Sequence, residues 1–544
     1  MKKRLFTQIL ALSLIGSFLT GCGMTSATKT DTAANGTSPS ETFAPTYAPT
    51  YAPVNSSQST TKYPYVSDTA ACEEGLFYDT NDCFIPYYEK ENGESYAVID
   101  ENGFLSVKKH PLSTFSADVD TASYSNLRRM IYDGYSLERI DPNAVRIEEM
   151  LNYFSYDYET PDEGEPFSVN SQIAPCPWNE DNYLLMLGLQ TEEIDFKNAP
   201  ASNLVFLIDV SGSMYSEDKL PLLQKSFEML CTNLTSKDRV SIVTYAGSDS
   251  IVLQGAKGND TDTIVNALES LSAGGSTNGS AGIKTAYELA EEYYIEEGNN
   301  RVILATDGDL NVGITSNDGL EKLITKKRNS GIFLSVLGFG TGNIKDDKME
   351  ILADKGNGNY SYIDSLKEAK KVLVEEMGAT LVTVAKDVKF QLEFNEDVVA
   401  SYRQIGYENR ALADEDFDDD TKDAGEVGAG SSVTVLYELT LTDKNSDAKK
   451  NASWVDLHIR YKEPDSDTST ESIYNIGKKS LIGKATGDIA FAAAVTEFGM
   501  LIRESEYAGT SSPSQINSLL KDADIRGDEY KEEFKVLVDL LLED

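Results

Sequence analysis

The sequence predicts an α/β fold in which a doubly wound, mostly parallel sheet is combined with a β-sandwich-like region and a C-terminal helical region. Three observations support it. Between residues 201 and 378, short apolar runs alternate with helical patterns. Strand-like segments occur on both sides of that block, and residues 480 to 544 have helical periodicity. A chain of 544 residues is long enough for several such domains.

The central block has the most regular alternation in the chain. In an open sheet built from such units, ligand sites form beyond the carboxyl ends of the strands. We therefore expect the functional residues of this block to follow its strands. The expected strands cover residues 204–209, 240–245, 302–306 and 333–338, and the expected helices cover 219–234, 264–271, 281–294, 320–328 and 366–377.

The flanking regions predict a second, β-rich domain. Alternating or apolar segments occur at 167–173 and 183–190 before the block, and at 388–394, 432–441 and 454–461 after it. The central domain is therefore expected to be inserted into a β-sandwich or to stand on one. Helical patterns at 127–132 and 145–154 precede these strands, and Asp or Thr within 118–121 is the expected N-cap of the first helix.

The first expected strand of the central block ends in three alternating oxygen-bearing residues. Asp209, Ser211 and Ser213 follow the apolar run from Leu204 to Ile208. One carboxylate and two hydroxyls suit a small hard cation such as Mg²⁺, which prefers oxygen ligands at about 2.0 to 2.1 Å. A turn in which Asp and Ser hydrogen-bond their own backbone explains the same residues, so this motif leaves both interpretations open.

Two later segments strengthen the metal interpretation. The glycine-rich stretch Gly274–Gly279 presents Thr277, and the second apolar strand, from Arg301 to Asp309, contains Asp307. Together the three motifs resemble the metal-ion-dependent adhesion site of a von Willebrand factor type A domain. The resemblance implies that Mg²⁺ (or Mn²⁺ or Ca²⁺) is held by Asp209, Ser211, Ser213, Thr277 and Asp307.

The resemblance also carries expectations about a partner. It implies that an acidic side chain of a protein ligand completes the coordination of the ion. It further implies that the helix from Ser365 to Met377 shifts on ligation.

The N-terminus has the features of an exported lipoprotein. Lys2, Lys3 and Arg4 precede an apolar stretch from Leu5 to Leu19, as in a secretory signal. Leu19–Cys22 resembles the lipobox of bacterial lipoproteins, which implies cleavage before Cys22 and a lipid anchor on it. We therefore expect attachment to the bacterial cell membrane or envelope. A transmembrane anchor is the alternative, although the apolar stretch is short for a span.

After residue 110 the chain is similar to a family of bacterial lipoproteins that carry a central von Willebrand A domain. The resulting layout has six parts. These are a signal peptide (1–21), a lipidated and disordered tether (22–65), an N-terminal von Willebrand-associated segment (66–165), a β-rich domain (166–200 with 379–470), the A domain (201–378) and a C-terminal helical region (480–544).

The remaining cysteines carry no catalytic signature. Cys72 and Cys83 are close together in an exported chain, so a local disulfide and two free thiols both remain open. Cys231 lies on the apolar side of a helical pattern and is expected in the core. Cys176 has no evident partner.

Charge and missing motifs exclude several functional classes. The net charge of −41 disfavours nucleic acid as a partner. The sequence has two histidines and lacks H-E-x-x-H, G-x-S-x-G and a P-loop, so no catalytic residues are assigned. Ser216–Lys219 fits S-x-x-K, a pattern short enough to arise by chance. The acidic segment 414–420 is expected to be a solvated hairpin connection, with Ca²⁺ binding as the alternative.

These expectations point to a cell-envelope lipoprotein that binds a protein through a divalent metal. The sequence also leaves two alternative functions open. The first is an envelope structural or assembly factor in which the metal is only structural. The second is a metal-assisted hydrolase, for which Asp309 is the nearby candidate base.

Overall fold

The computed structural model describes residues 93–117, 120–193, 199–274, 282–308, 317–376, 382–422, 424–442, 453–464, 466 and 468–542. The predictions for the signal peptide, the tether, Cys22, Cys72, Cys83, Thr277 and Asp309 lie outside the described residues.

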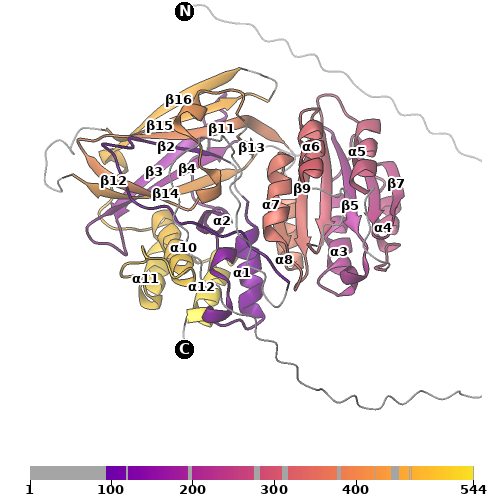
Figure 1. Ribbon diagram of the computed structural model, residues 1–544, viewed down its shortest axis with the longest axis horizontal. Coiled ribbons are helices and arrows are strands. Elements are labelled where there is room, and N and C mark those ends of the chain that lie inside the picture. The colour runs from indigo at the N-terminus through magenta and orange to yellow at the C-terminus, as the bar shows by residue number, and fades with distance from the viewer. Residues whose placement is uncertain are drawn as a thin grey trace, which may run out of the picture. The chain divides into compact units, whose positions relative to one another are not determined.

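The central domain is the predicted doubly wound α/β sheet (Figure 1). Its strand order is β10-β9-β8-β5-β6-β7, and every pair is parallel except β6 with β7. The strands are β5 (Ser202–Asp209), β6 (Arg239–Tyr245), β7 (Asp249–Lys257), β8 (Asn299–Thr306), β9 (Ile332–Phe339) and β10 (Tyr360–Ile363). The helices are α3 (Leu220–Cys231), α4 (Thr261–Glu269), α5 (Gly282–Glu292), α6 (Asn317–Arg328), α7 (Asp346–Lys355) and α8 (Leu366–Lys370), which continues as a π-helix over Lys371–Glu375.

Strand β5 is buried on both faces, as its unbroken apolar run predicts. Val205 and Leu207 pack among residues of α5, α6 and α7, whereas Leu204, Phe206 and Ile208 pack among residues of α3, α4 and α8. Cys231 is a free thiol in the second of these cores, as expected. The sheet thus has helices on both faces and holds the end of β5 in a fixed position.

The flanking strands form the expected sandwich, and the central domain is inserted between β4 and β11. One sheet has the order β1-β12-β14-β4-β3; the other has the order β13-β11-β15-β16, with β2 also paired to β11. The two sheets share one apolar core. The strands are β1 (Leu105–Ser106), β2 (Leu112–Ser116), β3 (Phe167–Pro175), β4 (Tyr183–Thr191), β11 (Thr383–Phe394), β12 (Val399–Ile405), β13 (Gly425–Gly428), β14 (Ser432–Leu441), β15 (Ser453–Lys462) and β16 (Ser469–Gly477).

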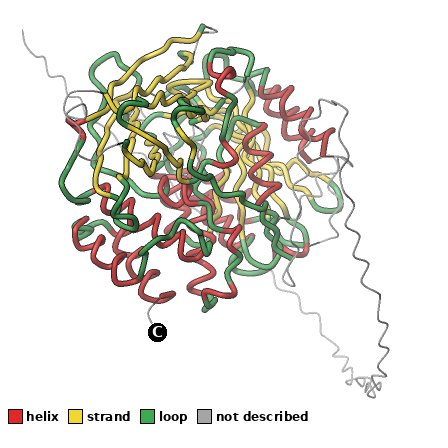
Figure 2. Tube along the Cα trace, turned by 60° about the vertical axis from the view of Figure 1, so that its left-hand side comes forward, coloured by secondary structure: helices red, strands yellow, loops and turns green. Residues whose placement is uncertain are grey.

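Helices from the two ends of the chain form a third layer. Their apolar faces pack with one another and with β3, β4 and β14, and Figure 2 shows the C-terminal helices beside the strands. Cys176 is a free thiol buried in this layer. The helices are α1 (Ala122–Tyr132), α2 (Ile147–Asn152), α10 (Asp488–Ile502), α11 (Pro513–Ala523) and α12 (Glu529–Leu542). Short 3₁₀ turns lie at Leu137–Arg139, Pro142–Ala144, Gly212–Tyr215, Glu408–Arg410, Asp414–Phe417 and Lys478–Ser480.

Two local predictions are correct only in part. Thr121 is the N-cap of α1, as predicted, but its side chain makes no capping bond. Asp120 accepts a hydrogen bond from the backbone of Tyr360 and pairs with Arg410. The acidic side chains of segment 414–420 are exposed or half-buried, as predicted, but the segment is not a hairpin connection, because β12 and β13 belong to different sheets. Phe417 is buried, and backbone carbonyls of this segment accept hydrogen bonds from Lys389. Long-range contacts therefore add to the local roles that the sequence suggested.

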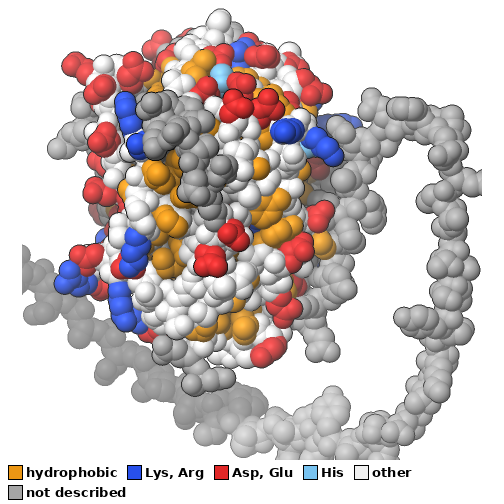
Figure 3. All heavy atoms as spheres, turned by 90° about the vertical axis from the view of Figure 1, so that its left-hand side faces the viewer, with side chains coloured by type: hydrophobic (Ala, Val, Ile, Leu, Met, Phe, Trp, Pro, Cys, Tyr) orange, Lys and Arg blue, Asp and Glu red, His pale blue; other side chains and the backbone are white. Residues whose placement is uncertain are grey.

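The outer surface carries the excess of acidic residues. Figure 3 shows Asp and Glu side chains distributed over one face, with fewer Lys and Arg among them and apolar side chains in separate groups. None of the helices within the described ranges has the length and apolar character needed to cross a bilayer.

Candidate functional site

Asp209 and Asp307 lie at the same edge of the central sheet. Strands β5 and β8 are adjacent and parallel, with Ile208 paired to Ala305. Asp209 is the last residue of β5, and Asp307 directly follows the end of β8. Both side chains are buried. Their shared edge is the one where open α/β sheets form ligand sites.

The turn after β5 gathers further oxygen atoms. Asp209 Oδ1 accepts a hydrogen bond of 2.8 Å from the backbone N–H of Ser211, and the hydroxyls of Ser211 and Ser213 are 2.8 Å apart. Met214 is buried in the core beneath the turn and anchors it. The Asp-turn and the metal-ligand interpretations are compatible in this geometry, because the backbone hydrogen bond uses only part of the capacity of the carboxylate.

The two carboxylates sit in an environment that favours a cation. The pKa of Asp209 is raised to about 6, mainly by burial and to a smaller extent by the neighbouring Asp307 carboxylate. Hydrogen bonds from Ser211 and Thr306 oppose this shift. Buried like charges repel, and a bound cation relieves that repulsion. The donor set of carboxylate and hydroxyl oxygens fits a hard divalent ion.

Lys219 belongs to this site, and the sequence analysis missed that role. Its Nζ donates a hydrogen bond of 2.8 Å to Asp307 Oδ2, and both side chains are buried. The Lys219 stem fits because position 340 is glycine with φ of +74°, where a Cβ would lie 2.3 Å from the stem. The available signal was a lysine directly before the apolar pattern of α3. This ammonium offsets one of the two negative charges.

The surface beside the site carries an unusual aromatic residue. Tyr215 ends the 3₁₀ turn that contains Ser213, and its side chain is 82% exposed. Tyrosine is enriched at protein interfaces because it offers a large, rigid surface with a polar tip. The turn therefore exposes a hydroxyl ligand candidate and an aromatic side chain together.

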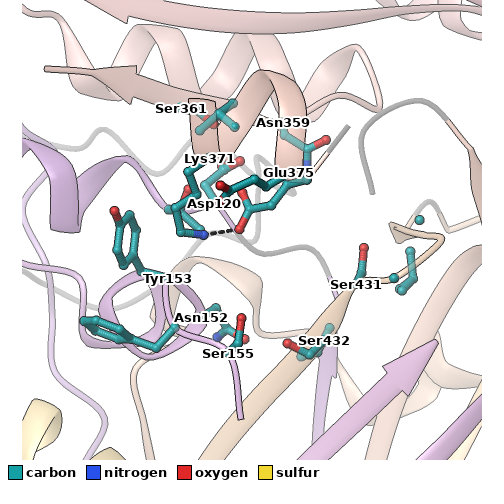
Figure 4. A pocket seen from close by; sticks show the side chains of 18 of the residues that line it. Asp120, Asn152, Tyr153, Ser155, Asn359, Ser361, Lys371, Glu375, Ser431 and Ser432 are labelled. Atoms are coloured by element: carbon teal, nitrogen blue, oxygen red, sulfur yellow. Dashed lines mark hydrogen bonds and ion pairs between the residues drawn. The ribbon is translucent and has the colours of Figure 1, made fainter. Parts of the chain in front are cut away.

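A separate cavity lies where the chain enters and leaves the central domain (Figure 4). It has a volume of about 440 Å³ and is lined by Glu193, Glu376 and Tyr530, among others. Lys371, from the π-helix, forms an ion pair with Glu376 there. The four metal-ligand candidates that the structure describes do not line this cavity, so it is separate from the Asp209 carboxylate.

Comparisons with protein families agree with this architecture. Residues 203–375 match the family "von Willebrand factor type A domain", and residues 90–186 match a family described as "von Willebrand factor". Residues 379–542 match "Uncharacterized protein YfbK, C-terminal".

Individual relatives extend the comparison. "Uncharacterized protein YfbK" of Escherichia coli (strain K12) is 42% identical over 471 residues, which are 82% of this chain and 80% of the relative. Human inter-alpha-trypsin inhibitor heavy chain H3 is 24% identical over 262 residues, which are 44% of this chain and 29% of that protein.

Similar solved structures include "von Willebrand factor type A from Catenulispora acidiphila", with a TM-score of 0.40 and 13% identity, covering 70% of this chain and 91% of that one. The ArnB paralog VWA2 from Sulfolobus acidocaldarius has a TM-score of 0.34 and 17% identity. The match covers 69% of this chain and 96% of that one.

The inserted α/β sheet and the motifs at its edge define a von Willebrand factor A domain protein. Within that class, the chain belongs to the YfbK family, since the similarity extends over most of both chains and includes the C-terminal region.

Proposed function

We propose that this protein is a cell-envelope lipoprotein that binds a protein partner through a divalent metal held by the central domain. The observation that carries the proposal is the pair of buried carboxylates, Asp209 and Asp307, at adjoining strand ends beside two serine hydroxyls. Thr277 is the fifth proposed ligand, and Mg²⁺, Mn²⁺ or Ca²⁺ is the proposed ion.

Each residue of the site would have a separate role. Asp209 and Asp307 supply the negative charge, and the Ser211 backbone N–H orients the Asp209 carboxylate. The bound ion would supply an electrophilic position that accepts a carboxylate from the partner. Ser213 and Tyr215 lie on the exposed side of the turn, where a partner would meet them.

The proposed location follows from the N-terminal sequence, with a lipid on Cys22 holding the exported chain at the membrane. The net charge of −41 opposes nucleic-acid binding, so we propose a protein partner. We propose a binding role and no enzymatic one, because the site motifs supply candidate metal ligands without a candidate nucleophile, and the one candidate base, Asp309, lies outside the described residues.

The test is the substitution Asp209→Ala in the full chain. We expect loss of saturable Mg²⁺ binding in calorimetry and loss of metal-dependent crosslinks to the partner in intact cells, because one of two charged ligands is removed. Glu217→Ala is the matched control: Glu217 is an exposed carboxylate in the same loop outside the ligand set, and its loss should leave both readouts unchanged. Equal partner capture in EDTA and in Mg²⁺ would contradict the proposal.

A second candidate is an envelope structural or assembly factor, and one observation favours it. Buried ion pairs join the central domain to the flanking regions: Arg146 to Glu350 at 2.7 Å and Arg128 to Glu368 at 2.7 Å. A domain held in this way can serve as a fixed part of a scaffold. Full retention of partner crosslinks by Asp209→Ala would favour this candidate over metal-dependent binding.

A further inference from the structure

A second cavity, of about 230 Å³, collects positive charge in a strongly acidic protein. It lies between the α6 and α7 side of the central domain and the loop that leads into β13. Among its lining residues are four cationic and two anionic side chains: Arg301, Arg328, Lys355, Arg410, Asp354 and Glu426. The chain as a whole has 89 acidic and 48 basic residues, so the excess of cations here is local.

Arg301 is the buried cation of this cavity. Its side chain is 4% exposed on β8, and its Nη1 donates a hydrogen bond of 2.6 Å to the Ser335 hydroxyl. Its Nε has no hydrogen-bond partner among the described residues, and no described carboxylate forms an ion pair with Arg301. Burial lowers the pKa of Arg301 to about 10, and the Glu426 carboxylate offsets only part of this effect. The guanidinium also lies 5.5 Å from the centre of the Phe333 ring. A buried charge that these contacts compensate only in part is costly.

The other cations have different roles. Arg410 makes ion pairs with Asp120, Glu350 and Asp354, so it holds the walls of the cavity together. Arg328 is half-buried and donates a hydrogen bond of 3.3 Å to the Asn357 side chain. Lys355 is exposed at the end of α7. Arg301, Arg328 and Lys355 thus bring cationic groups to the lining of the cavity from three different elements, β8, α6 and α7.

We propose that this cavity binds a small oxyanion, the phosphate or carboxylate group of a small ligand, with Arg301 as its main contact. A guanidinium offers paired N–H donors that match the geometry of an oxyanion. The volume is below the usual range of about 300 to 1,000 Å³ for larger ligands, which favours a small anion. The site is separate from the Asp209 site and independent of the metal proposal.

The test is a titration of the full chain with inorganic phosphate and, in a second arm, with citrate, against chloride at the same ionic strength. Calorimetry and thermal unfolding should show saturable binding with a Kd of about 1 mM or tighter for one of the two. A response to phosphate alone or to citrate alone identifies the group that is bound.

Three variants make the result decisive. Arg301→Met should lose the anion-dependent rise in Tm and should itself be at least as stable as the parent without anion, because it removes a poorly compensated charge. Arg328→Met should weaken binding severalfold. Arg239→Met is the control, since its guanidinium donates to the backbone carbonyls of Ser236 and Asp238 and does not line the cavity.

Two results would overturn the proposal: no saturable response to either anion, or an undiminished response in Arg301→Met. If Arg301→Met fails to fold, Arg328→Met and Lys355→Met give the same readout, and unchanged affinity in both would equally overturn it.

Discussion

The Lys219 ammonium limits how much negative charge the Asp209 site presents to an ion. We expect Lys219→Met to bind Mg²⁺ about tenfold more tightly, a change of about 1.4 kcal/mol, because the cation that competes for Asp307 is gone. The methionine keeps most of the stem that packs against Gly340. Calorimetric titration measures the affinity. Lys225→Met, an exposed lysine on the same helix, is the control, and equal affinities in the two variants would contradict the prediction.

Glu497 is a buried carboxyl group that makes stability depend on pH. It lies on α10 with no hydrogen-bond partner at either oxygen among the described residues. Burial raises its pKa from 4.5 to about 8; the Ser512 backbone N–H lowers it somewhat without reaching hydrogen-bonding geometry. Between pH 4.5 and about pH 8, the Glu497 carboxyl group keeps a proton in the folded chain that it has lost in the unfolded chain. The free energy of unfolding therefore falls as pH rises, by at most about 1.4 kcal/mol per pH unit.

Glu497→Gln should remove this dependence. We expect it to resemble the parent near pH 4.5 and to be more stable at pH 8, because the amide cannot ionise. Urea denaturation at several pH values measures the difference. Glu288→Gln, at an exposed position on α5, should follow the parent profile, and parallel profiles for parent and Glu497→Gln would refute the assignment.

At the scale of elements, the helix that leaves β10 is held from both sides. Arg128 of α1 pairs with Asp364 at 2.5 Å and with Glu368 at 2.7 Å, and the Tyr153 hydroxyl also donates to Glu368. From α12, the Tyr530 hydroxyl donates a hydrogen bond of 2.9 Å to Glu375. Any shift of the 365–377 helix, which the family resemblance implied, would have to break these contacts.

Arg128→Met should lower the free energy of unfolding by about 3 to 5 kcal/mol, because it leaves two buried carboxylates without their cation. Chemical denaturation measures this loss. Arg139→Met, which removes an arginine that stacks on the ring of Tyr135, should cost much less. A difference of less than about 1 kcal/mol between the two variants would show that the Arg128 cluster does not hold the helix.

The elements that the sequence predicted share one physical feature. Strands such as β5 and β8 have unbroken apolar runs because they are buried, and that composition is visible locally. Strands β7 and β16 were missed because they are only partly buried and polar residues interrupt their apolar pattern, and β10 was missed because it has only four residues. Helix α7 was missed because its core-facing side also carries Asp346 and Glu350, whose partner, Arg146, is distant in sequence.

The residues of the candidate site also differ in whether the local sequence predicts them. Asp209, Ser211 and Ser213 are close in sequence and form a pattern, and Asp307 follows a recognisable strand. Lys219 has no such pattern, because its role depends on a contact 88 positions away. The cationic cavity depends on the packing of the inserted domain against the sandwich, which periodicity does not reveal.

At the scale of the whole molecule, the inserted domain and the sandwich are joined by a few buried charges. Arg410, near the end of β12, forms ion pairs with Asp120 and with Glu350 and Asp354 of α7. Buried pairs of this kind destabilise strongly when one partner is removed, whereas exposed pairs contribute about 0 to 1 kcal/mol. Arg410 therefore couples the unfolding of two regions that each have a core of their own.

We expect Arg410→Met to separate their unfolding. Three carboxylates would lose their shared cation, so the contact between α7 and the sandwich should weaken while each core keeps its apolar packing. Differential scanning calorimetry should then resolve two transitions, or one broadened transition, whereas we expect a single sharp transition for the parent. Arg526→Met is the control, since the Arg526 side chain is 85% exposed and pairs with Asp524 at the surface. An Arg410→Met transition as sharp as that of the control would mean that apolar packing alone couples the two regions.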